Sequence, residues 1–317
     1  MATPYLSVVI PVYNESDNLQ LLYDRLTKAL DALDKTFEII FTNDGSRDNS
    51  LEMLNNFHTQ RPTQIRVIDF NGNFGQHQAV MAGFEHSRGD VVVTLDADLQ
   101  NPPEEIYKLL TEFEKGHDVV EGVRQMRQDN PFRRYASKLC NRLREKITGI
   151  KLTDQGSMLR AYSRRVTDLM VMSSEASAFI PALAYSFASN PGEVAVAHES
   201  RAAGESKYNL YSLLRLNFDL MTGYSLIPLQ FFTFLGVCIS GFSFIFVIYM
   251  FARRLIVGPE VGGVFTLFAI AFFLMGILLF GLGIVGEYVG RIYQEVRQRP
   301  RHVIRKITEE SIKKDVH

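Results

Sequence analysis

The sequence predicts an α/β protein in which an open, mostly parallel sheet with helices on both faces is followed by a C-terminal hairpin of two transmembrane helices. Strand patterns alternate with helix patterns between residues 7 and 123, as a parallel sheet requires. Acidic side chains follow several strands, where such a sheet binds ligands. Residues 220–252 and 261–286 carry no charge, and each run exceeds the roughly 20 residues that cross a bilayer.

The chain begins with two strand–helix units. Residues 7–13 (SVVIPVY) are typical of a buried strand, and a helix with leucines at helical spacing follows. Residues 37–42 form the second strand, which ends in Asn-Asp-Gly-Ser before another helix. The pattern then predicts a strand at 66–70, a turn at 72–75, a helix at 76–86, a strand at 90–95, an amphipathic helix near 106–113 and a strand at 118–123.

Two carboxylates, Asp96 and Asp98, stand where the strand at 90–95 ends and before a breaker at 101–103. An Asp-X-Asp pair there suits a hard divalent cation that shares its oxygen ligands with a substrate diphosphate. The alternative is a pair of solvated turn aspartates. A dinucleotide-binding oxidoreductase is disfavoured, because no G-x-G-x-x-G follows the first strand.

A basic segment follows, with nine Lys or Arg against three Asp or Glu between residues 121 and 151. Its apolar residues fall on one side of a helix at 131–148, which suits an anionic membrane surface, although an ordinary solvated helix has the same pattern. Residues 194–198 alternate like an edge strand. The loop after them carries Arg201, Ser206 and Lys207, which suit a phosphate, or else form a plain surface loop.

The apolar runs predict transmembrane helices near 229–251 and 265–285, joined by a short loop at 253–260. Basic residues are more frequent outside this hairpin than in its loop, so both termini should lie in the cytoplasm. We expect no cleavable signal peptide. The formal net charge of -1 gives no indication of nucleic-acid binding, and the two cysteines indicate neither a disulfide framework nor a metal cluster.

Four motifs together resemble the glycosyltransferase family 2 enzymes of the GT-A fold, a Rossmann-like fold, and particularly the polyprenyl-phosphate glycosyltransferases. They are SVVIPVYNE (7–15), NDGS (43–46), LDADLQ (95–100) with two prolines after it, and GESKY (204–208). Further motifs favour 4-deoxy-4-formamido-L-arabinose as the sugar, namely GQHQAVMAG (75–83), VRQMRQD (123–129), GSMLRAY (156–162), GEYVGRIY (286–293) and RPR (299–301). The resemblance covers nearly the whole chain.

The resemblance implies inverting transfer of a sugar from a UDP-sugar to undecaprenyl phosphate, with Mg²⁺ or Mn²⁺ held by Asp96 and Asp98. It implies that Asp98 is catalytic and that Asp154 is a base or orients the acceptor. The residues expected beside the UDP-sugar are Pro11, Tyr13, Glu15, Asp44, Asp96 and Gln100. Many members of the family carry Asp where this chain has Asn43. Because two anions must meet, we expect cations to hold the acceptor phosphate, helped by one hydroxyl: Arg124, Arg127, Arg201, Ser206 and Lys207.

The resemblance also implies a multi-pass protein of the bacterial inner membrane, with a cytoplasmic catalytic domain and a tetrameric assembly. The expected organisation is a GT-A domain over 1–208, a juxtamembrane amphipathic helix at 209–226, the hairpin at 227–287 and a cytosolic basic tail at 288–317. Three alternatives remain: a polyprenyl-phosphate glucosyl- or mannosyltransferase, a processive polysaccharide synthase, and a non-catalytic nucleotide-binding scaffold. The absence of Trp argues against the synthase, which usually carries Gln-x-x-Arg-Trp.

Overall fold

The structure is a computed structural model that describes residues 3–124, 157–173, 179–199, 226–258, 264–296 and 300–309. The chain divides into two compact units. The sheet unit comprises residues 1–138, 150–207 and 299–317, and the hairpin unit comprises residues 139–149 and 208–298. The α/β fold class and the C-terminal apolar helices that the sequence predicts are therefore confirmed.

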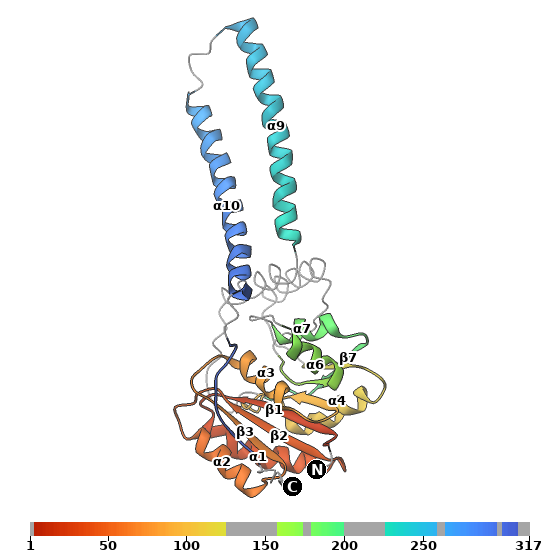
Figure 1. The fold of residues 1–317 in the computed structure, drawn as a ribbon. Coiled ribbons are helices and arrows are strands. Elements are labelled where there is room, and N and C mark those ends of the chain that lie inside the picture. The colour runs from red at the N-terminus through yellow and green to blue at the C-terminus, as the bar shows by residue number, and fades with distance from the viewer. Residues whose placement is uncertain are drawn as a thin grey trace, which may run out of the picture. The chain divides into compact units, whose positions relative to one another are not determined.

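Among the described residues, eight strands form one sheet in the order β7-β5-β6-β4-β1-β2-β3-β8 (Figure 1). Parallel pairing joins β1 to β2 and to β4, β2 to β3, and β5 to β7, whereas β6 and β8 pair antiparallel with their neighbours. The strands are β1 (Leu6–Val12), β2 (Phe37–Asn43), β3 (Ile65–Phe70), β4 (Val91–Thr94), β5 (Val119–Arg124), β6 (Arg160–Ser163), β7 (Pro191–Val196) and β8 (Ile304–Thr308).

Helices cover both faces of this sheet. They are α1 (Ser16–Asp31), α2 (Ser50–Gln60), α3 (Gln76–His86), the short 3₁₀ helix η1 (Pro103–Glu105), α4 (Ile106–Phe113), α6 (Arg164–Met172) and α7 (Ile180–Phe187). Because side chains alternate along a strand, Val8 and Ile10 of β1 pack in the core that contains α1, α2 and α4, while Val9 packs in the core that contains α3, α6 and α7. A Cβ on Gly83 of α3 would lie 2.2 Å from Val9, so α3 approaches β1 as closely as glycine permits.

Two strands were not expected from the sequence. β6 is short, contains the charged Arg160, and lies antiparallel between β4 and β5. β8 lies within residues 288–317, which we expected to form a basic tail, and it extends the sheet beyond β3. The strand expected at the edge near 194–198 is present as β7.

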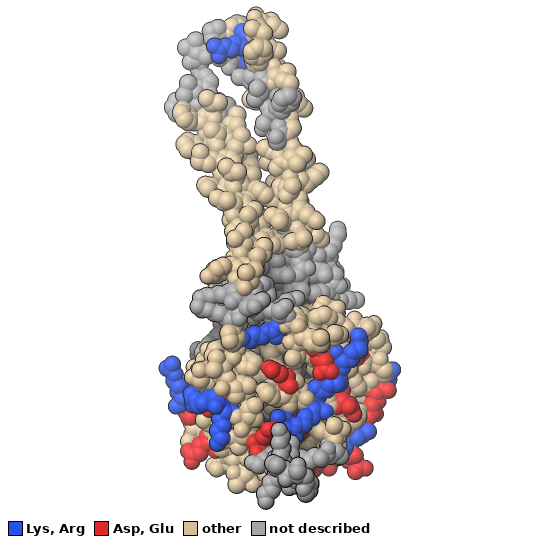
Figure 2. Space-filling model, in the orientation of Figure 1, with Lys and Arg blue, Asp and Glu red and all other residues tan. Residues whose placement is uncertain are grey.

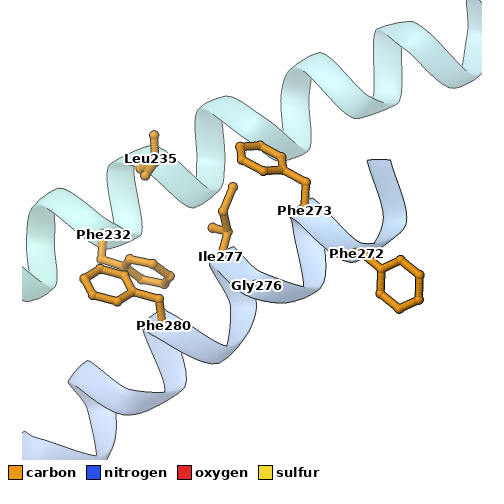
Figure 3. A pocket seen from close by; sticks show the side chains of 7 residues that line it. All are labelled: Phe232, Leu235, Phe272, Phe273, Gly276, Ile277 and Phe280. Atoms are coloured by element: carbon orange, nitrogen blue, oxygen red, sulfur yellow. The ribbon is translucent and has the colours of Figure 1, made fainter. Parts of the chain in front are cut away.

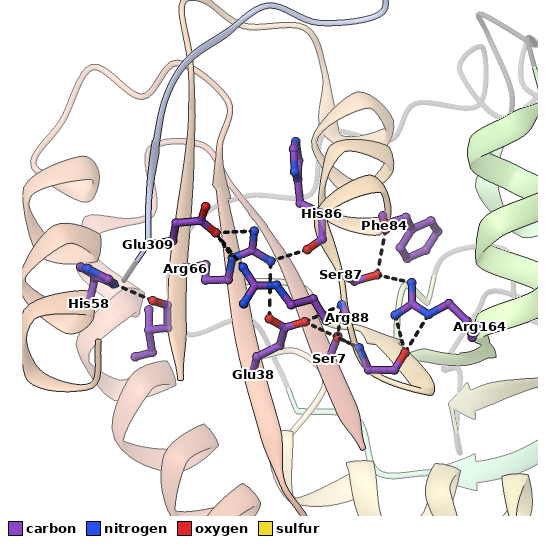
Figure 4. A network of polar contacts seen from close by, with 12 residues as sticks. Ser7, Glu38, His58, Arg66, Phe84, His86, Ser87, Arg88, Arg164 and Glu309 are labelled. Atoms are coloured by element: carbon purple, nitrogen blue, oxygen red, sulfur yellow. Dashed lines mark hydrogen bonds and ion pairs between the residues drawn. The ribbon is translucent and has the colours of Figure 1, made fainter. Parts of the chain in front are cut away.

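An ion-pair network holds the end of β8 at the edge where the parallel strands begin (Figure 4). Glu309 pairs with Arg66 at 2.7 Å and with Arg88 at 2.8 Å. Arg66 also pairs with Glu38, which accepts a hydrogen bond of 2.7 Å from the Ser7 hydroxyl. Residues from β1, β2 and β3 and the residue after β8 therefore share one polar cluster, in which Glu38 and Arg66 are buried.

The hairpin unit contains α9 (Ile227–Val257) and α10 (Val264–Val296), both longer than the predicted spans. Among the described residues, one segment, Ile270–Gly290, is long and apolar enough to cross a membrane, and the apolar segment Leu229–Ile239 is shorter. The two helices meet through the rings of Phe232 and Phe280, 6.1 Å apart, within an apolar groove (Figure 3). In Figure 2 the charged side chains gather on the sheet unit, and the described surface of the hairpin is mostly uncharged.

Candidate functional site

The topology of the sheet selects one place for a ligand. From β1 the chain moves to β2 and β3 on one side and returns to β4 on the other, so the order reverses between β1 and β4. At such a reversal the loops after the two strands diverge and leave a crevice at their carboxyl ends. The loops on the two sides of this place are the one after β1, which carries Tyr13 and Glu15, and the one after β4, which carries Asp96 and Asp98.

The loop after β4 presents its two carboxylates in different settings. Asp96 accepts a 2.6 Å hydrogen bond from the side-chain amide of Gln76, at the start of α3. Asp98 accepts a 3.1 Å bond from the backbone N–H of Gln100, and Leu99 between them has a φ of 61°. Both carboxylates are partly buried. A tight turn and a neighbouring helix thus hold the acidic pair in place.

Asp96 titrates in an unusual range. The pKa of Asp96 is raised to about 7, first because the carboxyl group is buried and second because Asp98 carries a negative charge nearby. The hydrogen bond from Gln76 and the charges of Arg160 and Arg124 act in the opposite direction. Asp96 is therefore poised to hold either a proton or a cation.

A buried ion pair joins β6, the strand next to β4, to β5. Arg160 of β6 and Glu121 of β5 are both fully buried and bonded to each other. Arg160 also donates to the carbonyl of Ser157, and the hydroxyl of Tyr185 donates to Glu121 at 3.1 Å. Burial raises the pKa of Tyr185, so its hydroxyl keeps the proton that it donates. The guanidinium is thereby fixed as a positive charge that favours ionised Asp96.

The residues expected to meet the nucleotide lie at the same edge of the sheet. Pro11 is buried near the end of β1, Tyr13 is 42% exposed, and Glu15 is partly buried and accepts a 2.7 Å bond from Asn18. The Asp44 carboxylate, in contrast, is turned to the protein itself. It accepts the backbone N–H groups of residues 74 and 75 at 2.6 and 2.9 Å.

Asp44 therefore holds the loop that leads into α3. Burial raises its pKa, although the two backbone donors oppose this shift. The next residue, Gly45, has a φ of 70°, and a Cβ there would lie 2.5 Å from the backbone of Gly72. Both contacts join the loop after β2 to the loop after β3, so a contact between the Asp44 side chain and a nucleotide stays a prediction.

Of the predicted acceptor-binding cations, the structure describes Arg124, which ends β5 and acts electrostatically on Asp96. The predicted residues Arg127, Asp154, Arg201, Ser206 and Lys207 lie outside the described residues, as do the helices predicted at 131–148 and, but for its last residue, at 209–226. The chain just before residue 200 is nevertheless placed. The backbone N–H of Glu199 donates to the carbonyl of Gln100 at 2.9 Å, which joins the strand β7 side of the sheet to the loop that carries Asp98.

Sequence reasoning assigned no role to Gln76, Glu121 or Arg160, although two of them lie in the motifs 75–83 and 156–162. The structure places the His77 ring edge-on to Phe179, at 5.5 Å, and its Nδ1 atom is buried without a hydrogen-bond partner in the described part of the chain. Burial and the charge of Arg160 lower the pKa of His77, which keeps the imidazole neutral.

No group of three or more His, Cys, Asp or Glu that could enclose a metal ion occurs among the described residues. A cation at the Asp96–Asp98 pair would have coordination positions for water and for phosphate oxygens of the substrate. This is the usual arrangement for Mg²⁺, which keeps several waters and binds one or two carboxylates together with phosphate oxygens.

Comparisons with known proteins agree with the motifs. Residues 7–169 match the family model described as glycosyl transferase family 2. The chain is 46% identical over 305 residues to the undecaprenyl-phosphate 4-deoxy-4-formamido-L-arabinose transferase of Shewanella sediminis, which covers 96% of this chain and 92% of that one. It is 47% identical to the protein of the same name from Aeromonas hydrophila, over 95% of this chain and 93% of that one. A solved structure of glucosyl-3-phosphoglycerate synthase from Mycobacterium tuberculosis aligns with 69% of this chain and 78% of that one, at 16% identity and a TM-score of 0.47.

Proposed function

Because the chain belongs to glycosyl transferase family 2, we propose that it transfers a sugar from a UDP-sugar to undecaprenyl phosphate. The structural observation that carries this proposal is the acidic pair after β4, placed at the switch point beside the loop after β1. The best candidate for the sugar is 4-deoxy-4-formamido-L-arabinose. This sugar appears in the names of the relatives that align with nearly the whole chain.

Asp96 and Asp98 are the residues that would hold a divalent cation, Mg²⁺ or Mn²⁺. Their fit is supported by the raised pKa of Asp96, which reflects burial of its carboxyl group first and the negative charge of Asp98 second. A bound ion would supply Lewis-acid stabilisation of the charge that develops on the departing diphosphate. Gln76 holds the Asp96 carboxylate in position, and the turn at Leu99 orients Asp98.

The nucleophile in this reaction is an oxygen of the lipid phosphate. A phosphate monoester has a second pKa near about 6, so at neutral pH it is mostly a dianion and needs no strong base. Its attack forms a bond to the anomeric carbon while the bond to UDP breaks, and a single displacement inverts that carbon. Asp154 would orient the acceptor rather than remove a proton.

The main task of the protein is therefore to bring two anions together. Arg124 supports this role, since its positive charge acts on Asp96, the carboxylate that we assign to the cation and the diphosphate. We assign Arg127, Arg201, Ser206 and Lys207 to the acceptor phosphate on their charge and hydrogen-bonding capacity. Pro11, Tyr13, Glu15, Asp44 and Gln100 are assigned to the donor.

We place the reaction at the cytoplasmic face of the bacterial inner membrane. The apolar segment Ile270–Gly290 supports one membrane crossing, and the uncharged run of α9 is proposed as a second. Basic residues beyond both outer ends of the hairpin favour a cytoplasmic sheet unit. A tetramer is the proposed assembly.

The test is a transfer assay on the full chain in detergent or liposomes. Purified protein is incubated with undecaprenyl phosphate, Mn²⁺ and a panel of UDP-sugars that includes UDP-4-deoxy-4-formamido-L-arabinose, UDP-glucose and UDP-N-acetylglucosamine, and the lipid product is identified by mass spectrometry. We expect product with the formamido-arabinose donor and a nearly complete loss of turnover in Asp98→Asn. Transfer from UDP-glucose alone would reassign the sugar. If no donor gives a lipid product while UDP still binds, a nucleotide-binding scaffold replaces the enzyme.

A further inference from the structure

The strand that follows the hairpin, β8, begins at the edge of the sheet where the loops after β1 and β2 lie. β8 pairs with β3 so that Asp69 faces Lys306 and Phe70 faces Ile304, and the register shifts between these two pairs. Arg305 is the extra residue at this bulge. Bulges redirect side chains, and the guanidinium of Arg305 lies 3.4 Å from the carboxylate of Asp69, which is 9% exposed.

Asp69 also contacts the next strand of the sheet, β2. Asn43 of β2 and Asp69 of β3 are direct partners in the parallel register. The side-chain amide of Asn43 donates a 2.8 Å hydrogen bond to the second oxygen of Asp69, and both residues are buried. One oxygen of Asp69 therefore forms an ion pair with a cation of β8, and the other accepts a hydrogen bond from a neutral donor of β2.

Asn43 in turn holds the loop after β2. Its side-chain oxygen accepts the backbone N–H of Ser46 at 3.3 Å, and the Ser46 hydroxyl accepts the backbone N–H of Asn14 at 3.1 Å. Asn14 has a φ of 54°, and its side chain accepts the N–H of Arg47 at 2.8 Å. A series of contacts thus runs from Arg305 of β8 through Asp69, Asn43 and Ser46 to Asn14, which lies between Tyr13 and Glu15.

We propose that Arg305, Asp69 and Asn43 are positioning residues for the nucleotide of the donor. Resting on the proposed function above, this inference makes the strand after the membrane hairpin part of the donor site, acting through β3 and β2 on the loops after β1 and β2. It also explains the amide at position 43. A carboxylate there would meet the Asp69 carboxylate at hydrogen-bond distance in a buried place, where two negative charges repel and no donor remains.

The experiment exchanges the two ends of the Asn43–Asp69 hydrogen bond. Three full-length variants in detergent are compared: Asn43→Asp, Asp69→Asn, and the double variant with both changes. Asn43→Asp removes the donor and adds a charge, Asp69→Asn keeps an acceptor for the amide, and the double variant restores one amide and one carboxylate in reversed order. The affinity for UDP in the presence of Mn²⁺ is measured by calorimetry, together with Tm and the transfer rate.

We expect Asn43→Asp to weaken UDP binding about tenfold, the size of a lost buried hydrogen bond to a charged group, and the double variant to return to within about threefold of the wild type. Asp69→Asn alone should cost about threefold or less. Arg305→Ala should weaken binding by about twofold to threefold, because its side chain is 57% exposed. Lys306→Ala, which removes the same charge from the same strand, should bind UDP as the wild type does.

Two results would overturn the inference. In the first, Asn43→Asp binds UDP like the wild type, even if its Tm falls. The contacts from Arg305 to Asn14 would then have a purely structural role. In the other, the double variant binds as weakly as Asn43→Asp although its Tm is that of the wild type. A wild-type chain that bound no UDP would instead remove the proposed function itself.

Discussion

Binding of Mn²⁺ to this protein should depend on pH through Asp96. A divalent ion needs both carboxylates ionised, and the pKa of Asp96 is raised to about 7 by burial and by the charge of Asp98. With that pKa, the ionised fraction falls from about 0.9 at pH 8 to about 0.1 at pH 6, so the apparent affinity should fall about tenfold over this interval. The sign follows from competition, because a proton on Asp96 excludes the cation.

The assay is a titration of the full chain with Mn²⁺, without nucleotide or lipid, in which free Mn²⁺ is measured by electron paramagnetic resonance. Omitting the lipid matters because its phosphate titrates in the same range. Gln76→Leu should move the midpoint upward by about one pH unit, since the 2.6 Å bond that stabilises ionised Asp96 is lost. Gln20→Leu, a similar change at an exposed position of α1, is the matched control.

Asp96→Asn should bind Mn²⁺ weakly at every pH, with no step near neutrality. The reasoning would be refuted if the wild-type affinity stayed constant between pH 8 and pH 6. It would also be refuted if Gln76→Leu and the wild type titrated with the same midpoint, because the hydrogen bond would then have no effect on the charge of Asp96.

Three further outcomes are expected. Gly83→Ala should lower stability by about 1–3 kcal/mol in a chemical denaturation series, because its Cβ would lie 2.2 Å from Val9 in a packed core; an unchanged midpoint would contradict this packing. Arg160→Met should cost about 3–5 kcal/mol, since it leaves the Glu121 charge buried alone, and adding Glu121→Gln should recover part of that loss. Arg124→Ala should raise KM for the lipid phosphate while the affinity for UDP stays unchanged, and the opposite pattern would move Arg124 to the donor site.

The sequence predicted the strands β1 to β5 and their order along the chain because buried parallel strands are short apolar runs that end at turn residues. It placed Asp96 and Asp98 at the end of β4 for the same local reason. The hairpin helices were equally predictable, since an uncharged run of this length has few other structures open to it. Their observed ends lie beyond the predicted ones because helical pattern continues past the apolar run.

The strands β6 and β8 could not be predicted because their signals are weak and their partners are distant. β6 is four residues long and contains Arg160, which is tolerated in the core only because Glu121 lies on the neighbouring strand. The sequence of β8 is typical of a basic tail, and it forms a strand only by pairing with the edge of β3. The hydrogen bond between Arg66 and Glu309, the residue after β8, joins positions 243 residues apart. The contacts of Asp44 also had no sign in the sequence, since the backbone N–H groups that donate to its carboxylate come from the loop after β3.

The amino-acid sequence by itself determined which residues form the buried strands, where the carboxylates stand along them, and which helices are apolar, because periodicity and chain breakers act over a few residues. Tertiary structure alone decided that Gln76 holds Asp96 and that the buried guanidinium of Arg160 pairs with Glu121. It also decided that contacts through Asp69, Asn43 and Ser46 join Arg305 to Asn14. The physical reason is that these contacts bring charges and hydrogen-bonding groups together across strands, and such pairings depend on the order in which the sheet assembles.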